Sequence, residues 1–173
     1  MSTTKWIIDP THSEVSFKVK HLVISTVTGY FKSFEGSAES TSDDFEGASV
    51  NFSAAIDSID TNQSDRDNHL KSDDFFNAEK FPKMTFVSTS FKKTKGNGYA
   101  LTGKLTIRDV TKEVTFSVVY GGTAKDQQGN IKAGFSASTT INRLDYNIKY
   151  DPTGAGIAKD VNIVLNLQFV QAK

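Results

Sequence analysis

The 173-residue chain contains no cysteine, three prolines and three histidines. Without cysteine it can form no disulfide, no thiol nucleophile and no cysteine-ligated zinc site. Its 20 basic and 20 acidic residues cancel, and no basic run or basic–aromatic stripe is present, so we expect no nucleic-acid partner. The absence of cysteine does not decide the compartment, because a cysteine-free chain folds in either redox environment.

Long apolar runs are also missing from the sequence. No segment approaches the roughly 20 apolar residues of a membrane-spanning helix, so we expect no transmembrane segment. The first ten residues, MSTTKWIIDP, contain no apolar core of a secretory leader. We therefore expect a cytoplasmic protein, or a periplasmic one if a leader has been removed from the chain.

Motifs for metal or covalent chemistry are missing as well. His12, His21 and His69 are not linked by HxH, HExxH or HxxxH spacing. There is no GxSxG and no P-loop, and the glycine clusters at 96–98 and 121–123 are typical of turns. We therefore predict no catalytic residue, no metal site and no cofactor.

Alternating apolar and polar residues are abundant. VNIVLNLQF at 161–169 and VTFSVVY at 114–120 place apolar side chains on every second position, which is typical of antiparallel strands with one buried face. Thirteen phenylalanines and many β-branched residues favour strands further. Eight strands are predicted, at about 14–20, 28–40, 48–60, 83–93, 98–108, 114–120, 131–141 and 161–169.

Eight antiparallel strands with one apolar face must either stack as a sandwich or close into a barrel. Closure also removes the exposed edges that promote aggregation. We predict an all-β fold, one domain over residues 1–173, built as an extended eight-stranded antiparallel β-barrel. The expected inward side chains mix large residues with small ones, and the small ones leave room for a pocket: Phe17, Phe52, Phe86, Phe116, Phe135, Ala54, Gly103, Ala133 and Ala137.

The segment RDNHLKSDDFF at 66–76 interrupts the strands. It predicts one short helix near residues 64–73, with Thr61 or Ser64 as its N-cap and Ser64 with Asp67 as a weak capping box. Such a helix can seal one end of a barrel, or it can form a lid that contacts a ligand. A third interpretation is a catalytic site that uses histidine and aspartate.

Six motifs in order resemble the YceI-like, polyisoprenoid-binding proteins. The resemblance covers about residues 5–170, and it implies a lipocalin-like barrel whose lumen takes a long isoprenoid chain, such as a polyprenyl phosphate or a quinone tail. The chain departs from the family at Asp109, where the family often has glycine. The motifs are WIIDPTHSEVSFKVKHL (6–22), GYFKSFEG (29–36), IDTNQSDRDNHLKSDDFF (59–76), FPKMTFVS (81–88), LTGKLTIRDVTKEV (101–114) and INRLDY (141–146).

The resemblance also implies recurring polar positions and a ligand site. The polar positions are His12, His21, Arg66, Asp67, His69 and Arg143. For the ligand we expect tunnel-lining residues, two phenylalanines that shield the mouth, and a residue that faces the head group. These are Phe17, Val19, Phe31, Phe52, Phe86, Phe116 and Phe135 for the tunnel, Phe75 and Phe76 for the mouth, and His69 or Arg66 for the head group.

The function expected from these residues is binding rather than catalysis. The protein would carry or sequester a long isoprenoid-type lipid. One alternative is a small-molecule hydrolase or isomerase that uses histidine and aspartate near the 66–76 helix, although helical spacing places Asp67 and His69 on different sides. Another is a ligand-free structural or stress protein with a filled barrel. Barrels can pair through exposed strands, so a homodimer is a further expectation, although no patch in the sequence marks it.

Overall fold

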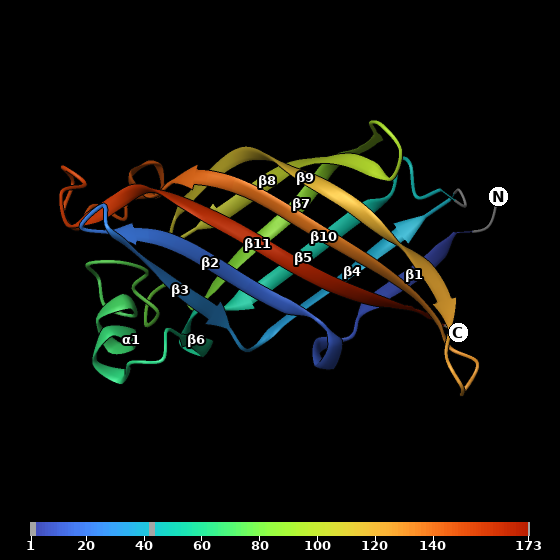
Figure 1. Cartoon of the computed structure of the whole chain (residues 1–173), viewed down its shortest axis with the longest axis horizontal. Helices are drawn as coiled ribbons and strands as arrows, with labels where there is room; N and C mark the ends of the chain where they lie inside the picture. Colours follow the sequence, from blue (N-terminus) through green and yellow to red (C-terminus); the bar gives the residue numbers. More distant parts are fainter. Residues whose placement is uncertain (1–2, 42–43, 173) are drawn as a thin grey trace.

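The strands form one antiparallel sheet that closes on itself (Figure 1). The computed structural model describes residues 3–41 and 44–172. Within those residues it has one α-helix, α1 (Ser64–Leu70), and short 3₁₀ turns at Pro10–His12, Ile56–Ser58 and Arg143–Tyr146. The strands are β1 (Thr4–Ile8), β2 (Glu14–His21), β3 (Ser25–Phe31), β4 (Phe34–Ser40), β5 (Ser49–Ala55), β6 (Ile59–Asp60), β7 (Lys83–Lys93), β8 (Gly98–Ile107), β9 (Val110–Lys125), β10 (Ile131–Asn142) and β11 (Ile157–Gln171).

Eight of these strands make a closed barrel. They neighbour one another in the order β1, β4, β5, β7, β8, β9, β10 and β11, and β1 pairs with β11 to complete the circle. In this closing pair Trp6 lies opposite Gln171, and Ile8 lies opposite Phe169. The predicted eight-stranded antiparallel barrel is therefore confirmed.

The strands β2, β3 and β6 prolong the barrel wall at one end. Along β11, β1 pairs with residues 169–171 and β2 pairs with residues 157–166. The same relation repeats outward, because β3 pairs with β2 where β4 pairs with β1, and β6 pairs with β3 where β5 pairs with β4. The strands β1 and β2, β4 and β3, and β5 and β6 are therefore three long barrel strands, each interrupted by a break.

The break between β1 and β2 has a local cause. Pro10 has no N–H to give to the ladder, and the side chain of Asp9 accepts the backbone N–H of Thr11 at 3.0 Å. Asp9 also accepts hydrogen bonds from the Thr11 hydroxyl and the His12 ring, which lower the pKa of its carboxyl to about 2. The chain therefore leaves the ladder for one 3₁₀ turn.

A second break separates β5 from β6, where the Ser58 hydroxyl donates to the carbonyl of Ala55 at 2.6 Å. Continuous strands over 28–40 and 48–60 are accordingly wrong, since each is split by a turn. The prediction also omits the strand at Thr4–Ile8, whose Trp6 and Ile8 are buried in the core. Short polar side chains compete with the ladder at such places, and periodicity alone does not reveal the competition.

The barrel wall is incomplete where β6 ends. β5 pairs with β7 over Asn51–Ala55, but β6, which continues its line, pairs only with β3 among the described strands. Residues 61–82 lead from β6 to β7 and carry α1 at this end of the barrel (Figure 1). We call this end of the barrel the α1 end. We call the opposite end, where β1 begins and β11 finishes, the far end.

The helix itself is shorter than predicted and is capped differently. It ends at Leu70 rather than near residue 73, and its N-cap is Gln63, whose side-chain oxygen accepts the Arg66 N–H at 2.6 Å. Asp67 instead accepts hydrogen bonds from the backbone N–H (2.8 Å) and hydroxyl of Thr61. The predicted caps, Thr61 and Ser64, and the capping box with Asp67 are therefore wrong, because Thr61 ties the helix to the end of β6.

The backbones of β7 and β8 approach each other closely at Gly103. A Cβ built on Gly103 of β8 would lie 2.4 Å from the Val87 carbonyl oxygen, 2.7 Å from the Ser88 Cα and 2.6 Å from the tip of the Phe86 ring. The register between β7 and β8 shifts immediately after Ser88. Only a residue without a side chain lets the two backbones approach this closely.

We expect Gly103→Ala to lower the free energy of unfolding by about 1–3 kcal/mol, because backbone atoms would have to move to admit the methyl group. Gly134→Ala in β10 is the matched control, since a Cβ there would meet nothing within 4 Å, and its effect should stay within about 0.5 kcal/mol. Urea unfolding of both variants measures the difference. Equal effects would show that the close approach at Gly103 is not needed.

Candidate ligand-binding site

The barrel encloses a cavity of about 570 Å³. This volume lies within the range of roughly 300–1,000 Å³ that small-molecule pockets occupy. Inward side chains from nearly every strand line it, and most of them are aromatic or aliphatic. All eleven predicted ligand-binding residues lie in the lining: Phe17, Val19, Phe31, Phe52, Arg66, His69, Phe75, Phe76, Phe86, Phe116 and Phe135.

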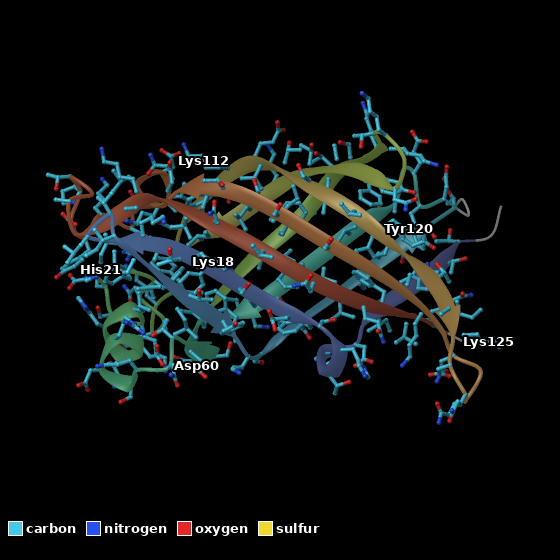
Figure 2. All side chains as sticks on the ribbon, viewed as in Figure 1. Lys18, His21, Asp60, Lys112, Tyr120 and Lys125 are labelled. Atoms are coloured by element: carbon cyan, nitrogen blue, oxygen red, sulfur yellow. The ribbon has the colours of Figure 1, made fainter. Side chains whose placement is uncertain are left out.

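An aromatic cluster occupies the far end of the cavity. Phe45, from the loop after β4, lies 5.3 Å from Trp6 and 5.2 Å from Phe135, measured between ring centroids. Tyr120 lies 5.4 Å from Phe45, and its strand position at this end is labelled in Figure 2. The indole N–H of Trp6 is buried without a hydrogen-bond partner among the described residues. The far end is therefore apolar and packed with rings.

The α1 end carries the ionisable groups of the lining. His21, labelled in Figure 2, lies at the tip of β2 on the opposite end from Tyr120. A chain-like guest would consequently have its apolar part in the barrel and a polar group only at the α1 end. The polar residues of the lining at this end are Lys20, His21, Asp65, Arg66, His69 and Arg143.

Arg66 is held on α1 by Thr61. Its Nε donates to the Thr61 hydroxyl at 2.7 Å, and its Nη2 donates to the Thr61 carbonyl at 2.6 Å. Thr61 is itself buried and bound to Asp67. The Nη1 group of Arg66 makes no hydrogen bond to any described residue, so it can donate to a guest.

His69 pairs with Asp74 rather than with Asp67. Its Nε2 lies 2.8 Å from a carboxylate oxygen of Asp74, and both side chains are about half exposed. The ring stands edge-on to Phe75 at 5.0 Å and to Tyr150 at 4.9 Å between centroids. The proposed separation of Asp67 from His69 is therefore confirmed, and a different carboxylate orients the imidazole.

Arg108 fixes the loop after α1. Its Nη1 donates to the carbonyls of Asp73 (2.8 Å) and Phe75 (2.7 Å), and its Nη2 donates to the Asp73 carboxylate at 2.8 Å. The hydrogen bond and the charge of Arg108 hold the pKa of that carboxyl below its usual range. Arg108, and not Asp109, adopts the left-handed backbone with φ 56°. The turn at Asp109, where the family often has glycine, therefore does not need a left-handed aspartate.

Arg143 is the buried arginine of the site, with 3% of its surface exposed. Burial lowers the pKa of its guanidinium, and the charge of Asp151 partly opposes that shift. All five of its N–H groups donate to backbone carbonyls, at the start of β11 and in the loop before it. These carbonyls belong to Ile148, Tyr150, Asp151, Ile157 and Ala158.

Sequence reasoning missed the role of this loop. The resemblance marked Arg143 as a polar family position, but it did not show that its donors are fully used by the protein's own backbone. Tyr150 and Ile148 line the cavity and were not predicted, because the stretch NIKYDP is short and lies between the predicted strands at 131–141 and 161–169. Only the five hydrogen bonds from the guanidinium group to backbone carbonyls reveal that Arg143 holds the loop in place.

The three histidines do not form a metal site. His12 pairs with Asp9 in the turn after β1, while His21 and His69 lie at the α1 end. Over residues 3–41 and 44–172, no three His, Asp or Glu side chains are arranged to hold a metal ion. In the same residues, no helix is long and apolar enough to cross a membrane.

Comparison with known sequences adds a family to this geometry. A family model described as a YceI-like domain matches residues 6–169. The chain belongs to the YceI-like family. A UPF0312 protein of Yersinia pestis is 40% identical over 164 residues, covering 94% of this YceI-like chain and 83% of the relative. A UPF0312 protein of Photorhabdus laumondii is 41% identical over 140 residues, covering 81% and 72%.

Solved structures of the YceI-like fold agree. The YCEI protein of Campylobacter jejuni is 32% identical, with a TM-score of 0.80 over 90% of this chain and 91% of that one. BcnA of Burkholderia cenocepacia is 24% identical, with a TM-score of 0.85 over 93% and 98%. A polyisoprenoid binding domain from Saccharophagus degradans is 13% identical, with a TM-score of 0.70 over 96% and 98%. The last two show the fold alone.

The function of Arg143 can be tested by removing its donors. Arg143→Met keeps much of the side-chain length but leaves five carbonyls without their N–H partners, so we expect the free energy of unfolding to fall by about 2–4 kcal/mol. Lys149→Met, an exposed lysine in the same loop, should change it by less than about 0.5 kcal/mol. Hydrogen exchange of residues 147–157 should rise only in the first variant, and unchanged exchange there would contradict the assignment.

Proposed function

We propose that this protein binds a long apolar isoprenoid-type lipid, with the chain in the barrel and the head group at the α1 end, and carries or sequesters it. The observation that carries this proposal is the 570 Å³ cavity, lined by rings and aliphatic side chains, whose charged groups all belong to one end. A polyprenyl phosphate or the tail of a quinone has this distribution of apolar and polar atoms.

The energy of binding would come from the chain. An isoprene unit has five carbons, and at about 0.8 kcal/mol per buried CH₂ each unit gains about 4 kcal/mol before ordering costs. The ceiling on binding energy per atom reduces that sum strongly. Affinity should therefore rise with chain length until the cavity is full, while different chains of equal length should bind similarly, because methylene groups give little directional discrimination.

A head group would meet Arg66 and His69. The Nη1 of Arg66 is uncommitted among the described residues, whereas every donor of Arg143 is already used by carbonyls. Arg143 therefore contributes positive charge near the head group and no hydrogen bond. Asp65, also in the lining, opposes an anion, so the balance between a phosphate and an uncharged quinone head depends on Arg66.

Relatives support the lipid class in general terms. The Saccharophagus degradans structure is described as a polyisoprenoid binding domain, and the chain shares its fold. Because that likeness is 13% identical, the specific guest is argued from the cavity of this chain. The alternative of a barrel filled by its own side chains is disfavoured by the volume that the lining leaves open.

The enzyme alternative has one supporting feature, the His69–Asp74 pair beside the cavity. A histidine oriented by a carboxylate can serve as a general base. However, no serine, threonine or tyrosine hydroxyl of the described residues bonds to the His69 ring, and the pair is half exposed. We propose that this pair fixes Phe75 and Tyr150 at the mouth, and that a guest leaves the protein chemically unchanged.

Chain binding is tested with prenols of increasing length and with Trp6, the one tryptophan of the chain. Because Trp6 lies at the far end of the cavity lining, its fluorescence should respond only to prenols long enough to reach it. Ala137→Phe, which points into the cavity, should weaken binding of the longest prenol by at least about tenfold. Ser138→Phe adds the same ring on the exposed face of β10 and should leave binding unchanged.

A lipid guest in the barrel would be contradicted if Ala137→Phe bound the longest prenol as tightly as the parent protein does. It would also be contradicted if the parent protein bound no prenol. Recovery of a chemically altered prenol after incubation would instead support the enzyme. Native mass spectrometry of the purified protein provides an independent measurement, because a retained lipid adds its mass to that of the chain.

The head group is tested by Arg66→Gln. We expect the affinity for farnesyl phosphate, measured by calorimetry, to fall by about threefold to tenfold, because a charge-assisted hydrogen bond is lost. The affinity for farnesol should change by less than about twofold, and Lys71→Gln, on the residue that follows α1, should leave both affinities unchanged. Equal losses for both ligands would mean that Arg66 positions the helix rather than a phosphate.

A further inference from the structure

The turn between β2 and β3 presents three consecutive apolar side chains to solvent. Leu22 is 53% exposed, Val23 is 78% exposed and Ile24 is 84% exposed. Single exposed apolar residues are ordinary on protein surfaces, but a contiguous group at the tip of a hairpin is typical of a surface that is covered in use.

The backbone of this turn is unfavourable for the residues it contains. Leu22 and Val23 have φ values of 53° and 66°, in the left-handed region. Leu22 and Val23 are the two central residues of a β-turn in which the Ile24 N–H donates to the His21 carbonyl at 3.2 Å. A turn with two left-handed central residues favours Asn-Gly, and a β-branched residue such as Val23 rarely adopts the conformation. The turn would be more stable with small polar residues. Its apolar side chains therefore point to a role outside folding.

Positive charge lies just behind the apolar tip. Lys18 and Lys20 are exposed on β2 and lie opposite Thr28 and Thr26 of β3, and Lys20 also borders the cavity at its α1 end. Neither lysine forms an ion pair with a described residue, and residues 17–28 contain no acid. The adjoining segment 147–160 has two lysines and two aspartates, so the hairpin keeps its positive charge. An apolar tip with a basic stem is complementary to a bilayer with anionic head groups.

The tip is continuous with the mouth of the cavity. His21 and Val27, which flank the turn, both line the cavity, and the N–H of Leu22 donates to the Gly156 carbonyl at 2.7 Å. Figure 1 shows the β2–β3 turn at the α1 end, beside the loop that precedes β11. A membrane that contacts the tip would therefore also face the polar end of the cavity.

We propose that Leu22, Val23 and Ile24 insert into the interfacial region of a lipid bilayer, while Lys18 and Lys20 contact anionic head groups. This inference rests on the proposed lipid guest, since it explains how a guest enters the barrel without crossing water. The occupant of the tip is a lipid surface. A second copy of the chain or another protein would be a different outcome of the test.

The test is flotation of the full chain with phosphatidylcholine vesicles, with and without phosphatidylglycerol. We expect binding to the anionic vesicles that weakens at high salt, because screening reduces the attraction of exposed charges. The double variant Leu22→Asn, Val23→Gly should reduce the vesicle-bound fraction by at least about tenfold. It also installs the preferred turn sequence, so its thermal midpoint should stay the same or rise, and lost binding cannot be attributed to misfolding.

Matched controls use apolar residues exposed elsewhere on the barrel. Val87→Thr and Val119→Thr remove side chains that are 52% and 53% exposed, and vesicle binding should not change. Lys18→Gln should weaken binding only to anionic vesicles. The proposal is overturned if the parent chain does not bind vesicles, or if the double variant binds them equally well. It is also overturned if the parent chain binds no vesicles but forms a dimer that dissociates in the double variant.

Prenol binding is measured on the same samples through Trp6. An unchanged prenol affinity in the double variant, together with lost vesicle binding, supports the docking role. If prenols bind but vesicle binding does not depend on the tip, the docking proposal fails and the lipid guest stands. If vesicles bind through the tip but no prenol binds, the proposed guest fails instead.

Discussion

The pairing of β1 with β11 is the interaction on which the rest of the structure depends. β11 holds β10 along one edge, and holds β1 and β2 along the other. Without the closing pair, two strand edges would expose unpaired N–H and C=O groups, and the apolar face would open to water. Closure also means that space not filled by inward side chains becomes an enclosed cavity rather than a surface groove.

The same wall cannot close at the α1 end, because β6 has two residues and pairs only with β3 among the described strands. Two arginines hold the segments that flank this opening. Arg108 binds the carbonyls after α1, and Arg143 binds those of the loop before β11. Guanidinium groups suit this work, because their planar donors satisfy several carbonyls at once. The segments at the mouth are therefore held by guanidinium donors that the protein's own backbone already uses.

Much of the fold was predictable, because each long strand carries its own period-two pattern. The residues of β9, β10 and β11 show this pattern, and it placed Phe116 and Phe135 on the inward face. The breaks at Asp9–Pro10 and Ser58 were not predictable, since hydrogen bonds from short side chains to the backbone leave periodicity nearly intact. The N-cap at Gln63 was missed for a related reason, because the Thr61 hydroxyl donates to the Asp67 carboxylate instead of capping the helix.

By itself the sequence determined the strand content, the direction in which most side chains point and, through six motifs in order, the family. These follow from local alternation and from residue identity, which need no knowledge of distant contacts. Only the tertiary structure decided that β1 pairs with β11 and that His69 contacts Asp74 rather than Asp67. It also decided that every N–H of the Arg143 guanidinium donates to carbonyls 5 to 15 residues away along the chain. Such pairings depend on which segments the barrel brings together, and the order of residues along the chain does not reveal which distant segments become neighbours.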